Sequence, residues 1–255
     1  MILTDTHTHL YSEAFKADRD AVIERALKAG ISRFFLPAID ASYSESMYAL
    51  QRQYPLNIHL MAGLHPTHVK ENYKVELKHI SEALKNRKFV AIGEIGIDLY
   101  WDKTTLKDQQ DAFCFQIQLA KNYNLPIVIH CREAFDEVFE ILETEKASDL
   151  FGIFHCFTGT LEQAQKAISY NMKLGIGGVV TFKNGKIDQF LSQIDLSDIV
   201  LETDAPYLSP VPYRGKRNES VYLLKVLEKV SDIYDLEKEK ISEITTKNAL
   251  YIFKT

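Results

Sequence analysis

Short apolar runs alternate with longer amphipathic stretches from one end of the chain to the other. Eight apolar runs predict β-strands, at residues 1–5, 34–39, 58–63, 89–93, 127–130, 152–156, 172–178 and 199–203. Between them, stretches such as 20–30 and 134–142 carry apolar residues at intervals of three and four, the spacing of one helix face. Buried parallel strands joined by helices form either an open doubly wound sheet or a closed barrel. Eight such units in 255 residues, without a linker-like change in composition, favour an α/β fold with a single (β/α)8 TIM-like barrel domain over residues 1–255.

Local signals at helix ends agree with this alternation. Residues 42–45 (Ser-Tyr-Ser-Glu) and 160–163 (Thr-Leu-Glu-Gln) both have the spacing of a capping box, in which two side chains satisfy free backbone amides. Gly30 follows a predicted helix, at a position where a left-handed backbone conformation favours glycine.

Composition narrows the class of protein. The chain is 46% hydrophobic and 25% charged, with few glycines and prolines, as in ordinary folded domains. Three cysteines without a Cys-x-x-Cys pair fit a reducing compartment. Neither a signal peptide nor a long apolar run is present, so we expect a cytoplasmic protein without a membrane anchor. The net charge of −5 argues against wrapping or sliding on duplex DNA by a basic face.

Several predicted strands end in side chains that bind metals. The first run leads into Asp5-Thr-His7-Thr-His9, and strand alternation places residues two apart on one face, so both imidazoles can reach one ion. Four other strand ends each carry a histidine or a carboxylate. The whole set is His7, His9, Glu94, His130, His155 and Asp204.

These six residues predict a metal site because the carboxyl ends of all barrel strands meet at one mouth. Six ligands exceed what one zinc-like ion takes, so we expect two divalent ions bridged by Glu94, the arrangement that activates water against phosphodiesters. Imidazoles and carboxylates suit Zn, Mn, Co or Fe better than Mg, although all five metals remain candidates.

Other polar residues follow the same strand ends. Contacts to substrate are expected from basic and imidazole side chains near the mouth, above all His65, Arg132 and Arg214, and also His68, Lys216 and Arg217. A solvated charged loop is the alternative for the basic cluster. His59 and His79 lie away from strand ends and are interpreted as ordinary histidines. Alternation would point Cys131 and Cys156 towards the helix layer, as core thiols.

Taken together, these blocks resemble the TatD family of metal-dependent deoxyribonucleases, within the amidohydrolase-like barrels. The matching blocks are Asp5-Thr-His-Thr-His9-Leu, Gly93-Glu94-Ile-Gly-Ile-Asp98, His130-Cys-Arg132-Glu-Ala, His155-Cys-Phe-Thr-Gly159, Glu202-Thr-Asp204-Ala-Pro-Tyr-Leu208, Arg214-Gly-Lys-Arg-Asn-Glu219 and Asn248-Ala. The resemblance covers the whole chain in order. Two departures occur: Thr67 stands within the family's His-Pro-His block, and Ser220 replaces a common proline.

The resemblance implies a TIM-like barrel, two divalent cations held by the same six residues, and hydrolysis of DNA, often from a 3′ end. We therefore expect a 3′–5′ exodeoxyribonuclease, monomeric, acting on single-stranded DNA or a strand end. In this mechanism Asp204 and Glu94 are catalytic, with Asp204 as metal ligand and proton acceptor. Two alternatives remain: a hydrolase of a cyclic amide or phosphotriester, and a binding or scaffold protein with relic ligands. Many amidohydrolase relatives bridge their metals with a carboxylated lysine, so Glu94 favours the nuclease.

Overall fold

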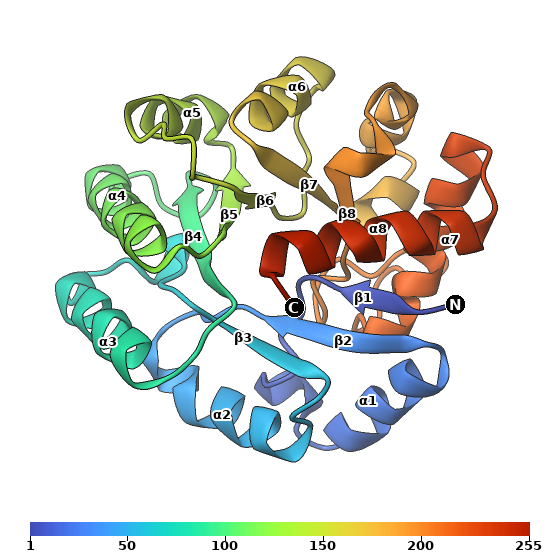
Figure 1. Ribbon diagram of the computed structural model, residues 1–255, viewed down its shortest axis with the longest axis horizontal. Coiled ribbons are helices and arrows are strands. Elements are labelled where there is room, and N and C mark those ends of the chain that lie inside the picture. The colour runs from blue at the N-terminus through green and yellow to red at the C-terminus, as the bar shows by residue number, and fades with distance from the viewer.

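Each predicted apolar run contributes a strand. The computed structural model describes residues 1–255, and its strands form one parallel sheet that curls into a nearly closed barrel (Figure 1). The strands are β1 (Leu3–Asp5), β2 (Ile31–Leu36), β3 (Ile58–Ala62), β4 (Ala91–Asp98), β5 (Ile127–Arg132), β6 (Gly152–Phe154), β7 (Met172–Ile176) and β8 (Ile199–Leu201). Their spatial order equals their order in the chain, which confirms the predicted TIM-like barrel.

The seam between β8 and β1 closes mainly beyond the ends of these two short strands. Thr6 donates its backbone N–H to the Leu201 carbonyl at 3.1 Å, and Asp204 donates to the His7 carbonyl at 2.9 Å. A single bridge joins Thr8 to Ala205. The segments that carry the candidate site residues therefore also close the barrel.

β4 is longer than the prediction. The apolar run stops at Gly93, because Glu94 interrupts it, yet every residue of β4 through Asp98 is buried. Buried carboxylates are tolerated where they have partners, and the contacts of Glu94 and Asp98 described below supply them.

The chain has eight α-helices, most of which lie around the barrel (Figure 1). They are α1 (Arg19–Lys28), α2 (Ser44–Gln53), α3 (Tyr73–Asn86), α4 (Leu106–Tyr123), α5 (Phe135–Thr144), α6 (Leu161–Ser169), α7 (Leu223–Tyr234) and α8 (Lys238–Phe253). None of these helices has the length and apolar character needed to span a bilayer.

The barrel is filled at one end by the C-terminal helix. A small apolar cluster joins inward-facing strand residues such as Phe35 and Val128 to Ile252 and Phe253 of α8. The Phe35 and Phe253 rings stack with their centroids 3.9 Å apart. In Figure 1, α8 accordingly crosses the barrel, and the C-terminus lies near its centre. This packing closes the amino end of the strands, so the opposite end is the open mouth.

Of the two predicted capping boxes, one is confirmed. The Thr160 hydroxyl accepts the Gln163 N–H, and the Gln163 side chain accepts the Thr160 N–H. The box at residues 42–45 is wrong, because Asp40 accepts the Ser42 N–H at 2.8 Å and starts a 3-10 turn (Ala41–Tyr43) that leads directly into α2. Gly30 has φ +90°, as predicted for its position after α1.

Candidate metal centre

The six predicted side chains gather at the open mouth. His7 and His9 follow β1, Glu94 lies within β4 and His130 within β5; His155 follows β6 and Asp204 follows β8. Ligand atoms of these residues and of His65 form groups of three that lie within 4.8 Å of one another. The groups are His7–His9–Glu94, His7–His155–Asp204 and His65–Glu94–His130.

Glu94 lies at the centre of the cluster. Its Oε2 is 3.1 Å from His7 Nε2 and 3.8 Å from His9 Nε2. Its Oε1 is 2.8 Å from His130 Nδ1 and 3.2 Å from His155 Nε2. The two carboxylate oxygens therefore face different imidazoles.

Asp204 completes the group around Oε2 of Glu94. Its Oδ1 lies 3.4 Å from His9 Nε2 and 3.7 Å from His7 Nε2. Asp204 has φ +57°, a left-handed conformation that a short polar side chain adopts more easily than most. The turn after β8 therefore brings this carboxylate against the histidines that follow β1.

Two histidines are oriented by acids outside the predicted set. His155 Nδ1 lies 3.1 Å from Glu202 Oε1, and His130 Nε2 lies 2.8 Å from Asp98 Oδ2. An ionised carboxylate only accepts hydrogen bonds, so these nitrogens carry protons. In a neutral ring the opposite nitrogen then turns a lone pair towards Glu94, whereas in an imidazolium it donates a proton to Glu94. Acceptors facing each other at 2.8 and 3.2 Å require a cation or a proton between them.

The histidines after β1 fit the same interpretation. Tyr11 donates its hydroxyl proton to the Pro37 carbonyl at 2.6 Å, so it accepts from His9 Nδ1 at 2.8 Å and leaves His9 Nε2 with a lone pair. Both ring nitrogens of His7 are buried without a hydrogen-bond partner. Such orphaned buried groups are costly. A divalent cation between the two carboxylates and the Nε2 atoms of His7 and His9 would satisfy these two nitrogens, and imidazole with carboxylate is a donor set that Zn, Mn, Co or Fe accepts.

The pKa values of the clustered side chains also favour a bound cation. Burial opposes ionisation of Glu94, yet the nearby His65, His155 and His7 hold its pKa well below the ordinary value. Burial also opposes ionisation of Asp204, whose pKa is nevertheless lowered by the His9 and His155 imidazoles. The pKa of His155 is raised well above 6.5, because Glu94 and Glu202 outweigh its burial. Two buried carboxylates thus stay ionised and need positive charge beside them.

His65 differs from the other imidazoles around Glu94. Its Nδ1 accepts the Thr67 backbone N–H at 3.1 Å, so its proton is on Nε2, 3.1 Å from Glu94 Oε1. Burial lowers its pKa to about 4, which keeps the ring neutral at pH 7. His65 therefore points a hydrogen-bond donor, rather than a lone pair, into the site.

The cluster opens into a cleft of about 670 Å³. Arg132 and Trp101 line it together with the site residues, and Thr158, Tyr207 and Leu208 form other parts of its wall. A cleft of this size accommodates a small molecule or a few nucleotides of a strand.

The other predicted substrate contacts lie outside this cleft. Arg214 stacks on Phe182, with its guanidinium carbon 3.7 Å from the ring centroid. Arg217 binds Asp18 at 2.7 Å and Glu219 at 2.9 Å, so it holds the loop after β8 against α1 instead of facing the mouth. Lys216 is exposed, and neither it nor His68 is among the residues that line the cleft. His68 instead pairs with Asp40 at 2.6 Å.

Comparison with known proteins agrees with the geometry. The sequence model of the family described as TatD related DNase matches residues 4–254. The chain belongs to the TatD family.

Among TatD-type relatives, the Bacillus subtilis protein YabD, named an uncharacterized metal-dependent hydrolase, is 39% identical over 99% of both chains. The crystal structure of YjjV, a TatD homologue from Escherichia coli, has a TM-score of 0.93, with 29% identity over 99% of this chain and 98% of YjjV. A TatD family hydrolase from Entamoeba histolytica has a TM-score of 0.86 at 20% identity over 99% of this chain and 98% of that one, which supports the fold alone.

Sequence reasoning missed the acids that support this TatD-type cluster. Asp98 and Glu202 hold His130 and His155, and Asp5 accepts both the N–H and the hydroxyl of Thr203, at 2.9 and 2.7 Å. Burial raises the pKa of Asp5 to about 7. The available signal was position: each of these acids lies two or four residues from a predicted ligand, and strand alternation places such residues on the same face.

The cysteine prediction is half right. Cys131 packs against the main hydrophobic core. Cys156 is not part of that core and lines the cleft, which Cys131 also borders. Its φ of +44° shows that extended backbone has already ended, so strand alternation no longer decides where its side chain points.

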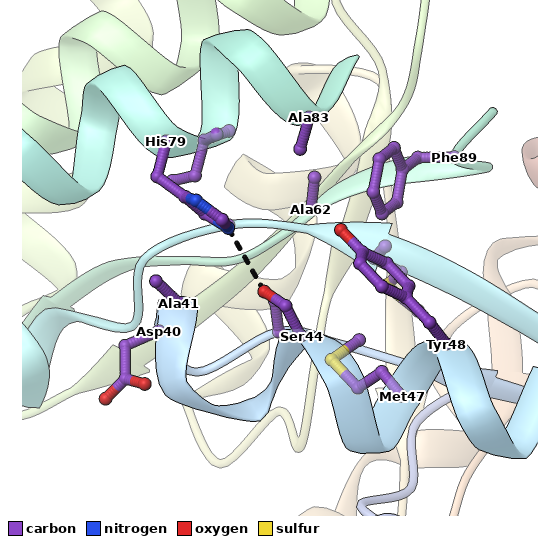
Figure 2. A pocket seen from close by; sticks show the side chains of 13 residues that line it. Asp40, Ala41, Ser44, Met47, Tyr48, Ala62, His79, Ala83 and Phe89 are labelled. Atoms are coloured by element: carbon purple, nitrogen blue, oxygen red, sulfur yellow. Dashed lines mark hydrogen bonds between the residues drawn. The ribbon is translucent and has the colours of Figure 1, made fainter. Parts of the chain in front are cut away.

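The two histidines interpreted as ordinary lie away from the mouth. His59 stacks on Phe35, with ring centroids 4.7 Å apart. His79 on α3 contacts the Ser44 hydroxyl on α2 at 3.1 Å, beside a small cavity with apolar walls (Figure 2). Its volume of about 20 Å³ leaves room for little more than one water molecule.

Proposed function

We propose that this TatD-family chain is a metal-dependent hydrolase that cleaves phosphodiester bonds of DNA, as a 3′–5′ exodeoxyribonuclease acting on single-stranded DNA or a strand end. The observation that carries the proposal is the position of Glu94, whose two oxygens face two separate groups of imidazoles in an open cleft. A carboxylate between two groups of nitrogen ligands is what a pair of bridged cations requires. The DNase family model and the metal-dependent hydrolases among the relatives support the same class.

In this proposal two divalent ions are bound. His7, His9, Asp204 and Glu94 would hold one ion, while His130, His155 and Glu94 would hold the other. When bound, such ions would supply positive charge and a water of lowered pKa. The mixed nitrogen and oxygen donors favour Zn, Mn, Co or Fe, with Mg as the remaining candidate.

The chain's own residues then have distinct tasks. Asp204 stays ionised and borders the cleft, so its carboxylate accepts the proton of the attacking water. His65 Nε2–H donates to the phosphate oxygen that gains charge in the transition state. Arg132 contacts a neighbouring phosphate from the cleft wall. Arg214, further out on the loop after β8, can contact only a phosphate beyond the cleft.

The test is cleavage of end-labelled single- and double-stranded DNA with each of several divalent metals. Wild-type protein should give a ladder that shortens from the 3′ end. Glu94→Gln and Asp204→Asn should each slow cleavage by about 100-fold or more, the usual cost of losing a catalytic base. Glu24→Gln is the matched control, because this carboxylate lies on the outside of α1 with 60% of its side chain exposed.

Other outcomes would contradict the proposal. Equal cleavage by Glu94→Gln and wild type would exclude this site as the nuclease centre. Metal-dependent hydrolysis of a phosphotriester or a cyclic amide, with DNA left intact, would instead establish the small-molecule hydrolase, which the volume of the cleft also allows.

We also propose a cytoplasmic monomer. All three cysteines are free thiols, which fits a reducing compartment. Size-exclusion chromatography with light scattering should give one chain of 29.2 kDa. A stable dimer would contradict this part of the proposal.

A further inference from the structure

An exposed aromatic pair borders the metal cluster. Trp101 is the only tryptophan of the chain and lines the cleft with 69% of its surface exposed. Tyr100 beside it is 50% exposed, and the two rings meet edge to face with centroids 5.0 Å apart. Large aromatic side chains gain most from burial. Adjacent exposed rings at a cleft are therefore a candidate contact surface for a ligand.

The segment that carries these rings is held rigidly to the site. Asp98 Oδ1 accepts the backbone N–H groups of Tyr100 and Trp101, both at 3.0 Å, while Asp98 Oδ2 holds His130 at 2.8 Å. The Gln109 side chain brackets the same turn by accepting the Asp98 N–H at 2.8 Å and donating to the Asp98 carbonyl at 3.1 Å. One carboxylate thus fixes both a candidate metal ligand and the start of the aromatic pair, so Trp101 is preorganised relative to the reacting centre.

A positive charge without an acidic partner lies beside the aromatic pair. Arg132 places its guanidinium carbon 3.7 Å from the Tyr100 ring centroid and 5.7 Å from that of Trp101. It also lines the cleft and forms no ion pair with any acid of the chain. Arginine beside exposed aromatic rings along a cleft is the combination that binds unpaired nucleic acid, with rings stacking on bases and cations facing phosphates.

We propose that Trp101 is a stacking platform for an unpaired base next to the scissile phosphate, with Arg132 contacting the adjoining phosphate. This inference rests on the proposed nuclease function and specifies its substrate as a strand whose terminal bases are free of a partner strand. Inside a duplex the bases are already stacked on both faces, so the platform takes unpaired bases from a single strand or a frayed end. Stacking also tolerates any base, because every base has a π-face.

The sole tryptophan makes binding directly observable. A phosphorothioate-linked ten-residue oligothymidylate, which resists hydrolysis, should quench the fluorescence of metal-loaded wild-type protein in a saturable manner. A blunt duplex of equal length should quench less at the same concentration. Absence of quenching at saturating oligonucleotide, with binding verified by the anisotropy of a labelled strand, would overturn the proposal.

Variants separate stacking from a general surface effect. Trp101→Ala should weaken oligonucleotide binding by about 5- to 150-fold, the range that base–aromatic stacking spans per base. Trp101→Phe should retain most of the wild-type oligonucleotide binding, because phenylalanine keeps a π-face. Tyr251→Ala is the matched control, since this aromatic side chain is 76% exposed on α8, outside the cleft lining. Equal binding by Trp101→Ala and Tyr251→Ala would refute the platform.

A substrate without bases distinguishes this inference from the proposed function. Replacing the last three nucleotides of a hydrolysable strand by abasic residues should lower wild-type kcat/KM by a factor similar to that of Trp101→Ala on the normal strand. In the Trp101→Ala variant, the same replacement should lower kcat/KM only slightly further. Unchanged kcat/KM in Trp101→Ala would defeat the platform while leaving the nuclease in place. Quenching by oligothymidylate without cleavage of any DNA would defeat the nuclease instead.

Discussion

Replacing Asp98 with asparagine tests how the cluster is held, without removing any candidate ligand. Asp98 is buried, and its Oδ1 accepts two backbone N–H groups at 3.0 Å, which an asparagine oxygen can still do. The asparagine amide would then face His130 Nε2 at the position where Asp98 Oδ2 lies at 2.8 Å. Because an amide nitrogen only donates, His130 would have to move its proton to Nδ1, the nitrogen that faces Glu94.

The expected consequence is weaker metal binding in a protein that still folds. Loss of a partner that orients a ligating histidine lowers metal affinity about 10- to 100-fold, or about 1.4–2.7 kcal/mol. The hydrogen bond to a charged group is also lost, so the free energy of unfolding of chelator-treated protein should fall by about 1.5–3 kcal/mol at most. Isothermal titration of chelator-treated protein with zinc or manganese measures the first effect, and urea denaturation measures the second.

Asp102→Asn is the matched control for this experiment. Asp102 lies on the same loop, is partly exposed, and accepts only from Thr104 through Oδ1. It should bind metal as wild type does. If Asp98→Asn bound every ion as tightly as Asp102→Asn, the assignment of the His130 lone pair towards Glu94 would be wrong.

Further predictions concern stability and reactivity. Gly96→Ala should lower the free energy of unfolding in urea by at least about 1–3 kcal/mol, because φ is +136° and a Cβ would lie 2.0 Å from the His130 carbonyl oxygen. An unchanged urea midpoint would contradict this close approach of the two backbone segments. Phe253→Ala should cost about 3–5 kcal/mol by the same assay, since this ring fills the closed end of the barrel, whereas a loss below about 1 kcal/mol would mean that α8 does not seal it. Arg217 holds the pKa of Asp18 below its ordinary value, so Arg217→Ala should lower the melting temperature at pH 7. The difference in melting temperature from wild type should shrink as the pH falls below about 4, because Asp18 is then protonated. A difference that grows at low pH would contradict the ion pair. Burial raises the pKa of all three thiols. Iodoacetamide at pH 8 should therefore modify the native protein slowly and the guanidinium-unfolded protein quickly. Equal rates of modification would contradict the burial of the thiols.

Most of the scaffold could be predicted because its signals are local. The eight apolar runs overlap the eight strands, and the spacing of apolar residues at three and four marks the helices between them. The exception is not local in origin. β4 extends past Gly93 because Glu94 and Asp98 are satisfied from neighbouring strands, which no reading of hydrophobicity detects.

The candidate site could be predicted as a set of residues but not as an arrangement. Topology alone brings strand ends to one mouth, so the six side chains gather once the barrel is inferred. The orientation of each imidazole depends on residues far away in sequence: His130 on Asp98, 32 positions earlier, and His155 on Glu202, 47 positions later. The sequence pattern marks such acids only as polar residues near strand ends.

The sequence by itself determined the alternating elements, the closed eight-stranded architecture and the residues that meet at its mouth, because periodicity and chain order require no knowledge of distant contacts. The tertiary structure decided which nitrogen of each histidine faces Glu94, that Arg217 binds Asp18 across 199 positions instead of facing substrate, and that Trp101 stands exposed beside the cluster. These properties depend on hydrogen bonds, ion pairs and burial between segments that only folding brings together.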